Sequence, residues 1–190
     1  DAEVILSLLA RNRILLDRME DAIFQMMDEV EGAYALVLMT PGKLIGVRDP
    51  LGIRPLCLGK LGTSYMLASE SCAIDALGGE FIRDVKPGEV VTISRDGVSS
   101  EMYRGVRESH GNGALCIFEF VYFARPDSFI DGASVYESRH TAGRILAREH
   151  PCEADMVIGA PDSGIVAAMG FAEESGIPYG AGLLKNRYVG

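Results

Sequence analysis

The stretch "DMVIGAPDSGI", Asp155 to Ile165, decides the fold class of the second half of the chain. An apolar strand runs into a short Pro-Asp-Ser-Gly loop, and a helical pattern, "IVAAMGFAEES", follows directly. Another strand begins at "IPYGAGLL", so the order is strand, helix, strand. This order is typical of a βαβ unit, in which a right-handed crossover joins two parallel strands.

The aromatic stretch upstream, "ALCIFEFVYFARPDSFIDG" (residues 114–132), extends the same pattern. We predict that it begins with a strand, whose alternating side chains serve mainly in packing. A helix is expected from about Ser134 to Arg148, before the βαβ unit. The linker "ESHGNG" (residues 108–113) separates this α/β region from what precedes it.

The first part of the chain follows a different pattern. A helix capped by Asp1 and a second helix from about Ile14 to Val30 open it, and we interpret the methionines of the second helix as core. After Gly32, short β-rich runs alternate with turns such as "DPLG", "KPG" and "RDG" and predict a meander of antiparallel strands. Many of these strands are apolar on both faces, which fits a sheet sandwiched inside an α+β domain.

Composition limits the classes of partner. The 190 residues carry a net charge of −9, which argues against nucleic acid or an anionic membrane as the main partner. No apolar run approaches the ~20 residues of a membrane-spanning helix. The four cysteines have no CxxC spacing and, with no secretory signal, are expected as free thiols in a reducing cytoplasm. Nucleotide-binding glycine motifs and the GxSxG hydrolase motif are absent.

Three places carry candidate chemistry, and each has a plainer interpretation. Asp162 and Ser163 lie at a strand-to-helix junction that suits an anion or a hard cation, but either can simply cap its own helix. Lys185 and Arg187 follow the next strand, where cations meet phosphates or line a solvated loop. Asp49 in "GVRDPLGIRPL" either meets an ammonium group in a pocket or forms a local ion pair.

Long motifs then indicate a family. "GAYALVLMT", "LIGVRDPLGIRPLCLGKLG" and "YMLASESCAIDALGGEFIRDVKPGEVV" resemble the later part of the glutaminase domain of amidophosphoribosyltransferases. "CIFEFVYFARPDSFIDG", "APDSGI" and "GLLKNRYVG" resemble the start of their phosphoribosyltransferase domain. The resemblance implies an α+β glutaminase region of the N-terminal nucleophile hydrolase type, with sandwiched antiparallel sheets, over residues 1–107. An α/β parallel-sheet phosphoribosyltransferase region is then expected over residues 108–190.

The resemblance also implies a reaction. The family hydrolyses glutamine and uses the ammonia to convert phosphoribosylpyrophosphate to 5-phosphoribosylamine, with release of pyrophosphate, in the first step of purine synthesis. Asp49 matches the residue that binds the α-amino group of glutamine, and Ser163, beside Asp162, matches a Mg²⁺ contact. Four residues match the opening of a loop that closes over phosphoribosylpyrophosphate: Lys185, Asn186, Arg187 and Tyr188.

Cys116 matches one ligand of the 4Fe–4S cluster that one branch of the family carries, although cluster-free members also have a cysteine there. The family's nucleophilic cysteine and its acidic phosphoribosyl-binding loop have no counterpart here, so we expect an internal fragment that is inactive alone. The resemblance further implies a cytoplasmic homo-oligomer, commonly a tetramer, with purine nucleotides as feedback inhibitors.

Two other interpretations stay open from the sequence. A non-catalytic relative could keep binding of glutamine or phosphoribosyl groups as a regulatory module. Another glutaminase-coupled synthetase is the weaker alternative, because "KNRYVG" after a "PDS" loop argues against it.

Overall fold

The computed structural model describes residues 2–105, 113–186 and 188, and the chain divides into two compact units. The first unit comprises residues 1–69 and 74–115, and the second comprises residues 70–73 and 116–190. The boundary predicted between residues 107 and 108 lies in the stretch 106–112, outside the described residues. No helix among the described residues is long and apolar enough to cross a membrane.

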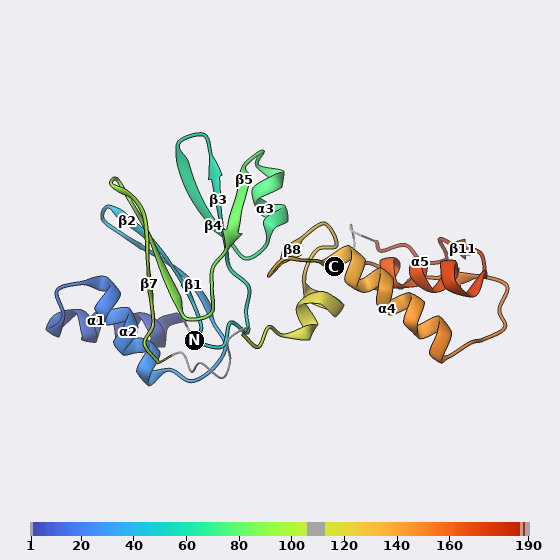
Figure 1. Ribbon diagram of the computed structural model, residues 1–190, viewed down its shortest axis with the longest axis horizontal. Helices are drawn as coiled ribbons and strands as arrows, with labels where there is room; N and C mark the ends of the chain where they lie inside the picture. Colours follow the sequence, from blue (N-terminus) through green and yellow to red (C-terminus); the bar gives the residue numbers. More distant parts are fainter. Residues whose placement is uncertain (1, 106–112, 187, 189–190) are drawn as a thin grey trace. The chain divides into compact units, whose positions relative to one another are not determined.

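Two antiparallel sheets form the centre of the first unit (Figure 1). The four-stranded sheet has the order β1-β2-β6-β7, with β1 (Ala35–Thr40), β2 (Lys43–Arg48), β6 (Glu89–Ser94) and β7 (Gly97–Met102). The three-stranded sheet has the order β4-β3-β5, with β3 (Cys57–Leu61), β4 (Ser64–Ala68) and β5 (Glu80–Asp84). The predicted antiparallel pairing is therefore confirmed, but a simple meander is not, because β2 pairs with β6 and the intervening strands β3, β4 and β5 form the second sheet.

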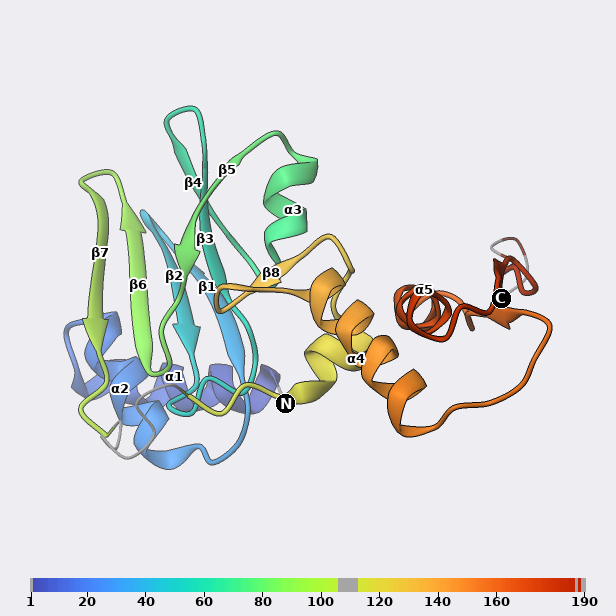
Figure 2. The same cartoon turned by 45° about the vertical axis from the view of Figure 1, so that its right-hand side comes forward.

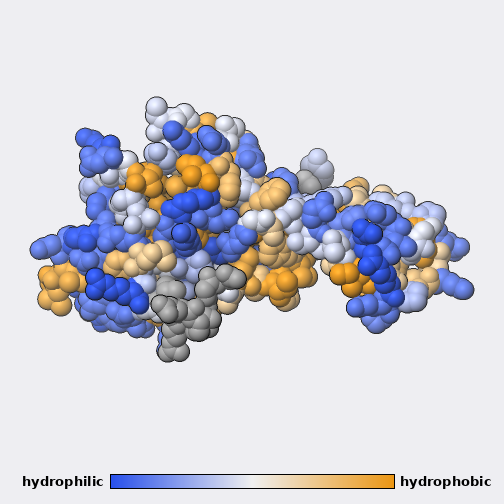
Figure 3. Space-filling view, in the orientation of Figure 1, coloured by the Kyte–Doolittle hydropathy of each residue, from blue (hydrophilic) through white to orange (hydrophobic). Residues whose placement is uncertain are grey.

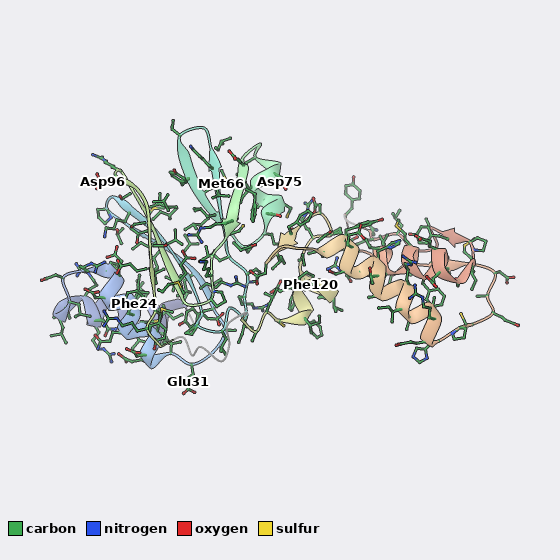
Figure 4. The ribbon with its side chains drawn as sticks, viewed as in Figure 1. Phe24, Glu31, Met66, Asp75, Asp96 and Phe120 are labelled. Carbon is green, nitrogen blue, oxygen red and sulfur yellow. The ribbon has the colours of Figure 1, made fainter. Side chains whose placement is uncertain are left out.

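Two helices, α1 (Ala2–Leu15) and α2 (Met19–Glu29), cover one face of the four-stranded sheet in both ribbon views (Figures 1 and 2). Ile23, Met26 and Met27 of α2 are buried against Ile45 and Val47 of β2, so the methionines belong to the core, as predicted. The ring of Phe24, labelled in Figure 4, stacks on a tyrosine that follows β7, with 6.3 Å between centroids.

The other face of this sheet packs on the three-stranded sheet. Leu56, Leu58, Val85 and Val91 form the buried cluster between them. Gly46 of β2 allows the close approach, since an added Cβ would lie 2.9 Å from the Leu67 side chain. The central strands are thus buried on both faces, as the two-sided apolar pattern predicts.

The predicted start of the second helix at Ile14 was wrong, because α1 continues to Leu15. Ile14 is 81% exposed, so its apolar side chain does not mark a buried face. The inward face is instead set by Leu9 and by Asn12, whose amide donates to the Ala22 carbonyl at 3.3 Å. Apolar periodicity alone cannot locate a break between two helices that share one core.

The second unit contains the predicted βαβ unit. Strands β10 (Val157–Ile158) and β11 (Tyr179–Gly180) pair in parallel, and α5 (Gly164–Ser175) connects them. Helix α4 (Val135–Glu149) is capped by Ser134, which accepts a hydrogen bond from the Glu137 amide at 3.2 Å. A short hairpin precedes α4, formed by β8 (Phe129–Ile130) and β9 (Ala133–Ser134).

Helices α4 and α5 pack closely, side by side in Figure 1. A Cβ added to Gly143 would lie 1.9 Å from the Ala167 carbonyl oxygen, and one added to Gly170 would lie 2.0 Å from the His140 carbonyl oxygen. The two glycines therefore let the helix backbones approach each other.

The aromatic stretch is not a strand, and that prediction was wrong. Its centre forms a π-helix, η2 (Glu119–Phe123), in which the Ala124 amide donates to the Glu119 carbonyl at 3.0 Å. Hydrogen bonds within the segment thus satisfy its backbone groups. The β-propensity of aromatic residues depends on a neighbouring strand, and the structure pairs no strand with this segment. Its exposed apolar surface is visible in Figure 3 and comprises Ile117, Phe118, Val121, Tyr122 and Phe123.

The last helix, α3 (Ser71–Ala76), lies between β4 and β5 in the chain. Residues 70–73 at its start belong to the second unit. There the Glu70 carboxylate accepts bonds from the Arg125 amide at 2.8 Å and the Ser128 hydroxyl at 2.7 Å.

Candidate functional sites

Asp49 directly follows β2 and is 0% exposed. Its carboxylate accepts three backbone amides: Oδ1 takes Leu51 at 3.0 Å and Ile53 at 3.2 Å, and Oδ2 takes Arg54 at 3.3 Å. A carboxylate has about four acceptor sites, so these three bonds leave about one for a further donor. The loop thus fixes a buried negative charge with limited remaining capacity for a ligand.

Arg48, beside it in the chain, is equally buried and supports the loop. Its guanidinium donates to three carbonyls, those of Arg54 at 2.9 Å, Gly52 at 2.9 Å and Val85 at 2.6 Å. The guanidinium therefore satisfies buried carbonyls of the backbone around Asp49. This structural role goes beyond the local ion pair considered from the sequence.

Tyr34 completes the surroundings of Asp49. Its carbonyl accepts the Asp49 amide at 3.0 Å, while its hydroxyl is buried without a hydrogen-bond partner among the described residues. Burial raises the pKa of this hydroxyl, and the negative charge of Asp49 raises it further. The phenol is therefore neutral and holds an unused O–H donor.

A hollow of about 490 Å³ in the second unit brings together three of the predicted residues, Asp162, Ser163 and Lys185. The Lys185 ammonium lies 3.6 Å from the Asp162 carboxylate. Ser163 stands at the N-cap of α5, yet its side chain makes no capping bond. The plainer interpretation, that Ser163 only caps its helix, is thus not realised in this conformation.

Among the described residues of the loop after β11, Lys185 lines the hollow. The Asn186 side chain accepts the Tyr188 amide at 3.0 Å, and the Tyr188 side chain is 99% exposed. Arg187 lies outside the described residues.

Two arginines that line the hollow were missed from the sequence. Arg125 is exposed and binds Asp127 through two bonds of 3.0 and 2.8 Å. Arg139 is 4% exposed and donates to the Phe120 carbonyl at 2.6 Å and the Ala124 carbonyl at 2.8 Å. The sequence spacing could have indicated that Arg139 is buried, because every fourth residue of α4 lies on its buried face: Val135, Arg139, Gly143 and Ala147.

The described residues contain no group of three or more metal-ligating His, Cys, Asp or Glu side chains. Cys116 is half-buried, and all four cysteines are free thiols. One thiolate cannot hold a 4Fe–4S cluster, so these residues do not fit that group. Asp162 and Ser163 do fit Mg²⁺, which proteins commonly bind through one or two carboxylates together with substrate phosphates.

Comparison with known proteins agrees with the motifs. The family model described as "Glutamine amidotransferase domain" matches residues 1–76. Proteins named amidophosphoribosyltransferase from Archaeoglobus fulgidus and Bacillus subtilis are 50% and 44% identical over 190 residues, which is the whole chain. These 190 residues correspond to 41% and 39% of the two relatives, about two fifths of their length.

Solved structures give the same result. The glutamine phosphoribosylpyrophosphate amidotransferase from B. subtilis, complexed with ADP and GMP, matches the whole chain with a TM-score of 0.90 and 43% identity. This match covers 40% of that protein. A structure described as the allosteric regulatory enzyme of purine biosynthesis matches 99% of the chain, and 39% of its own length, with a TM-score of 0.89. The chain belongs to the amidophosphoribosyltransferase family.

Proposed function

We propose that the whole protein transfers the amide nitrogen of glutamine to phosphoribosylpyrophosphate. Glutamine is hydrolysed to glutamate and ammonia, and the ammonia nitrogen then bonds to C1 of the sugar. The C1–O bond to pyrophosphate breaks, one proton is released, and 5-phosphoribosylamine results. The observation that carries the proposal is the match of all 190 residues to relatives that bear the name of this enzyme at 44–50% identity.

We assign the first unit, with residues 1–107 as its predicted domain, to glutamine. Asp49 holds the α-amino group, because a buried carboxylate fixed by three amides offers a negative charge at a defined position. The remaining acceptor site of Asp49 suits an ammonium donor, and the oxygen of the unpaired Tyr34 hydroxyl is a second possible acceptor nearby.

We assign the second unit, within the predicted phosphoribosyltransferase region 108–190, to phosphoribosylpyrophosphate. Asp162 and Ser163 would hold Mg²⁺ with the substrate's phosphate oxygens, and the ion would neutralise charge on the departing pyrophosphate. Lys185 lies in the same hollow and would turn from Asp162 to a phosphate oxygen. Asn186, Arg187 and Tyr188 would continue this wall as a closing loop that excludes water.

The remaining features are also part of the proposal. The relative solved with ADP and GMP supports purine nucleotides as regulators of this protein. A cytoplasmic location agrees with four free cysteines, and a homo-oligomer is expected for the family. Cys116 would supply one ligand of a 4Fe–4S cluster, so a cluster in the whole protein would need its other ligands from outside this cysteine.

The Asp49→Asn variant of the whole protein tests the glutamine assignment. Asn keeps an oxygen for the Leu51 and Ile53 amides but removes the negative charge that binds an ammonium. We expect the KM for glutamine to rise at least tenfold, which corresponds to about 1.4 kcal/mol. Synthesis with ammonia as the nitrogen donor should stay largely intact.

Asp75→Asn is the matched control, since Asp75 lies exposed on α3 (Figure 4) and should change neither reaction. Equal loss of the glutamine-dependent and ammonia-dependent reactions in Asp49→Asn, with normal stability, would show that Asp49 does not serve the glutamine pocket.

A further inference from the structure

Arg139 combines burial with unused hydrogen-bond donors. The guanidinium has five N–H groups, and its bonds to the carbonyls of Phe120 and Ala124 use Nε and Nη2. Neither bond involves Nη1, and no carboxylate among the described residues forms an ion pair with Arg139. A charged group that is 96% removed from water without an anionic partner is costly in a protein interior.

The free donors have access to a ligand, because Arg139 lines the hollow at the start of α5. Arg125 and Lys185 line the same hollow, while Asp162 is the carboxylate among its lining residues. Burial lowers the pKa of the Arg139 guanidinium, and the Glu70 carboxylate acts in the opposite direction. Arginine nevertheless stays charged in proteins. Because Arg125 pairs with Asp127 and Lys185 pairs with Asp162, the charge of Arg139 is the positive charge at the hollow that has no ion pair among the described residues.

Two backbone carbonyls fix the position of the Arg139 guanidinium. The carbonyls of Phe120, within η2, and of Ala124, directly after it, hold its guanidinium, and the residues from Tyr122 to Arg125 form one wall of the hollow. Phe120 is labelled in Figure 4. The next residue in that wall, Arg125, is held in turn by the Glu70 carboxylate through its amide. A planar, pre-positioned fork of this kind suits the oxygens of a phosphate group better than a flexible ammonium does.

We propose that Arg139 is a phosphate-binding residue of this hollow and that its free N–H donors bind the pyrophosphate group of phosphoribosylpyrophosphate. The choice of ligand rests on the proposed function, and the contact itself rests on the burial, the free donors and the charge around the hollow. Arg139 then binds the pyrophosphate leaving group, and its bonds to the carbonyls of Phe120 and Ala124 also hold the η2 segment in place.

Isothermal titration calorimetry of the whole protein with inorganic pyrophosphate and Mg²⁺ measures the affinity for pyrophosphate and so tests the contact without any turnover. Arg139→Lys keeps the charge and one bond to a carbonyl but loses the fork, and we expect at least tenfold weaker pyrophosphate binding. Arg144→Lys is the control, because Arg144 lies on the same helix and binds Glu174 at 3.0 Å. It should bind pyrophosphate as the wild type does.

Kinetics separate binding from a purely structural role. Arg139→Lys should raise the KM for phosphoribosylpyrophosphate at least tenfold and leave the KM for glutamine unchanged. A folded variant with unchanged pyrophosphate affinity and an unchanged KM for phosphoribosylpyrophosphate would overturn the proposal.

If Arg139→Lys does not fold, a crystal structure of the wild type with pyrophosphate and Mg²⁺ decides the question. We expect Nη1 of Arg139 within about 3.2 Å of a phosphate oxygen. Pyrophosphate bound elsewhere would overturn the proposal. The outcome is separable from the proposed function: a protein that binds pyrophosphate through Arg139 but forms no phosphoribosylamine would contradict only the function.

Discussion

Replacing Arg48 by methionine should destabilise the first unit strongly. Methionine keeps much of the length and volume of arginine but removes every donor to the carbonyls of Gly52, Arg54 and Val85. Those carbonyls surround a side chain that is only 1% exposed, so water cannot readily replace the lost donors.

The magnitude follows from opposing contributions. Each buried carbonyl left without a donor costs about 1–3 kcal/mol, and three of them together cost several. Removing a buried guanidinium relieves its own desolvation, which offsets part of that cost. We therefore expect Arg48→Met to lower the free energy of unfolding by about 3 kcal/mol. For a chain of this size that corresponds to a fall in Tm of roughly 6–12 °C.

Urea unfolding of the 190-residue chain, followed by far-UV circular dichroism, measures this change. Arg95→Met is the control, since Arg95 is exposed at the β6–β7 turn and should change stability by no more than about 0.5 kcal/mol. A loss below about 1 kcal/mol for Arg48→Met, or one equal to that of the control, would refute the view that Arg48 supports the loop around Asp49.

Two further predictions concern buried polar groups. Tyr34→Phe should stabilise the chain by about 1 kcal/mol, because it removes a buried hydroxyl that has no partner among the described residues. Tyr103→Phe is the control and should not stabilise the chain, because the Tyr103 hydroxyl is bonded to Asp28. Thermal unfolding compares the two, and a clear loss for Tyr34→Phe would show a partner for its hydroxyl. Glu89 is buried, which raises its pKa, but bonds from Arg83 and the Lys86 amide bring the pKa below its ordinary value. This stabilisation is complete above the unfolded pKa of about 4.3 and is lost as pH falls through the lower folded pKa. The loss of unfolding free energy caused by Glu89→Gln should therefore become smaller when the pH is lowered from 6 to 3. A loss that stays constant would contradict a stabilising role for the ionised Glu89 carboxylate.

Much of the fold could be predicted because local signals and burial agree. Turn residues delimit the strands of the first unit, and β2 and β6 are apolar on both faces because a helical layer and a second sheet cover them. Ser134 marks the start of α4 by the bond that it forms. At the hollow, the ends of two neighbouring parallel strands bring Asp162 and Lys185 together, as the βαβ order requires.

The failures have physical causes as well. The residues of η2 favour strands when a neighbouring strand is present, and here helical bonds within the segment satisfy the backbone instead. Arg139 was missed because an arginine in a helix is usually exposed, and its burial depends on the carbonyls of Phe120 in η2 and Ala124 directly after it. Such contacts join residues about 15–19 positions apart, which no local pattern records.

The most direct test of the central claim is the yield of glutamate and pyrophosphate from the purified whole protein. With glutamine, phosphoribosylpyrophosphate and Mg²⁺ present, we predict that the two products form in a one-to-one ratio. Ammonia in place of glutamine should give pyrophosphate without glutamate. No pyrophosphate with either nitrogen donor, from a protein that still binds phosphoribosylpyrophosphate, would contradict the proposed reaction.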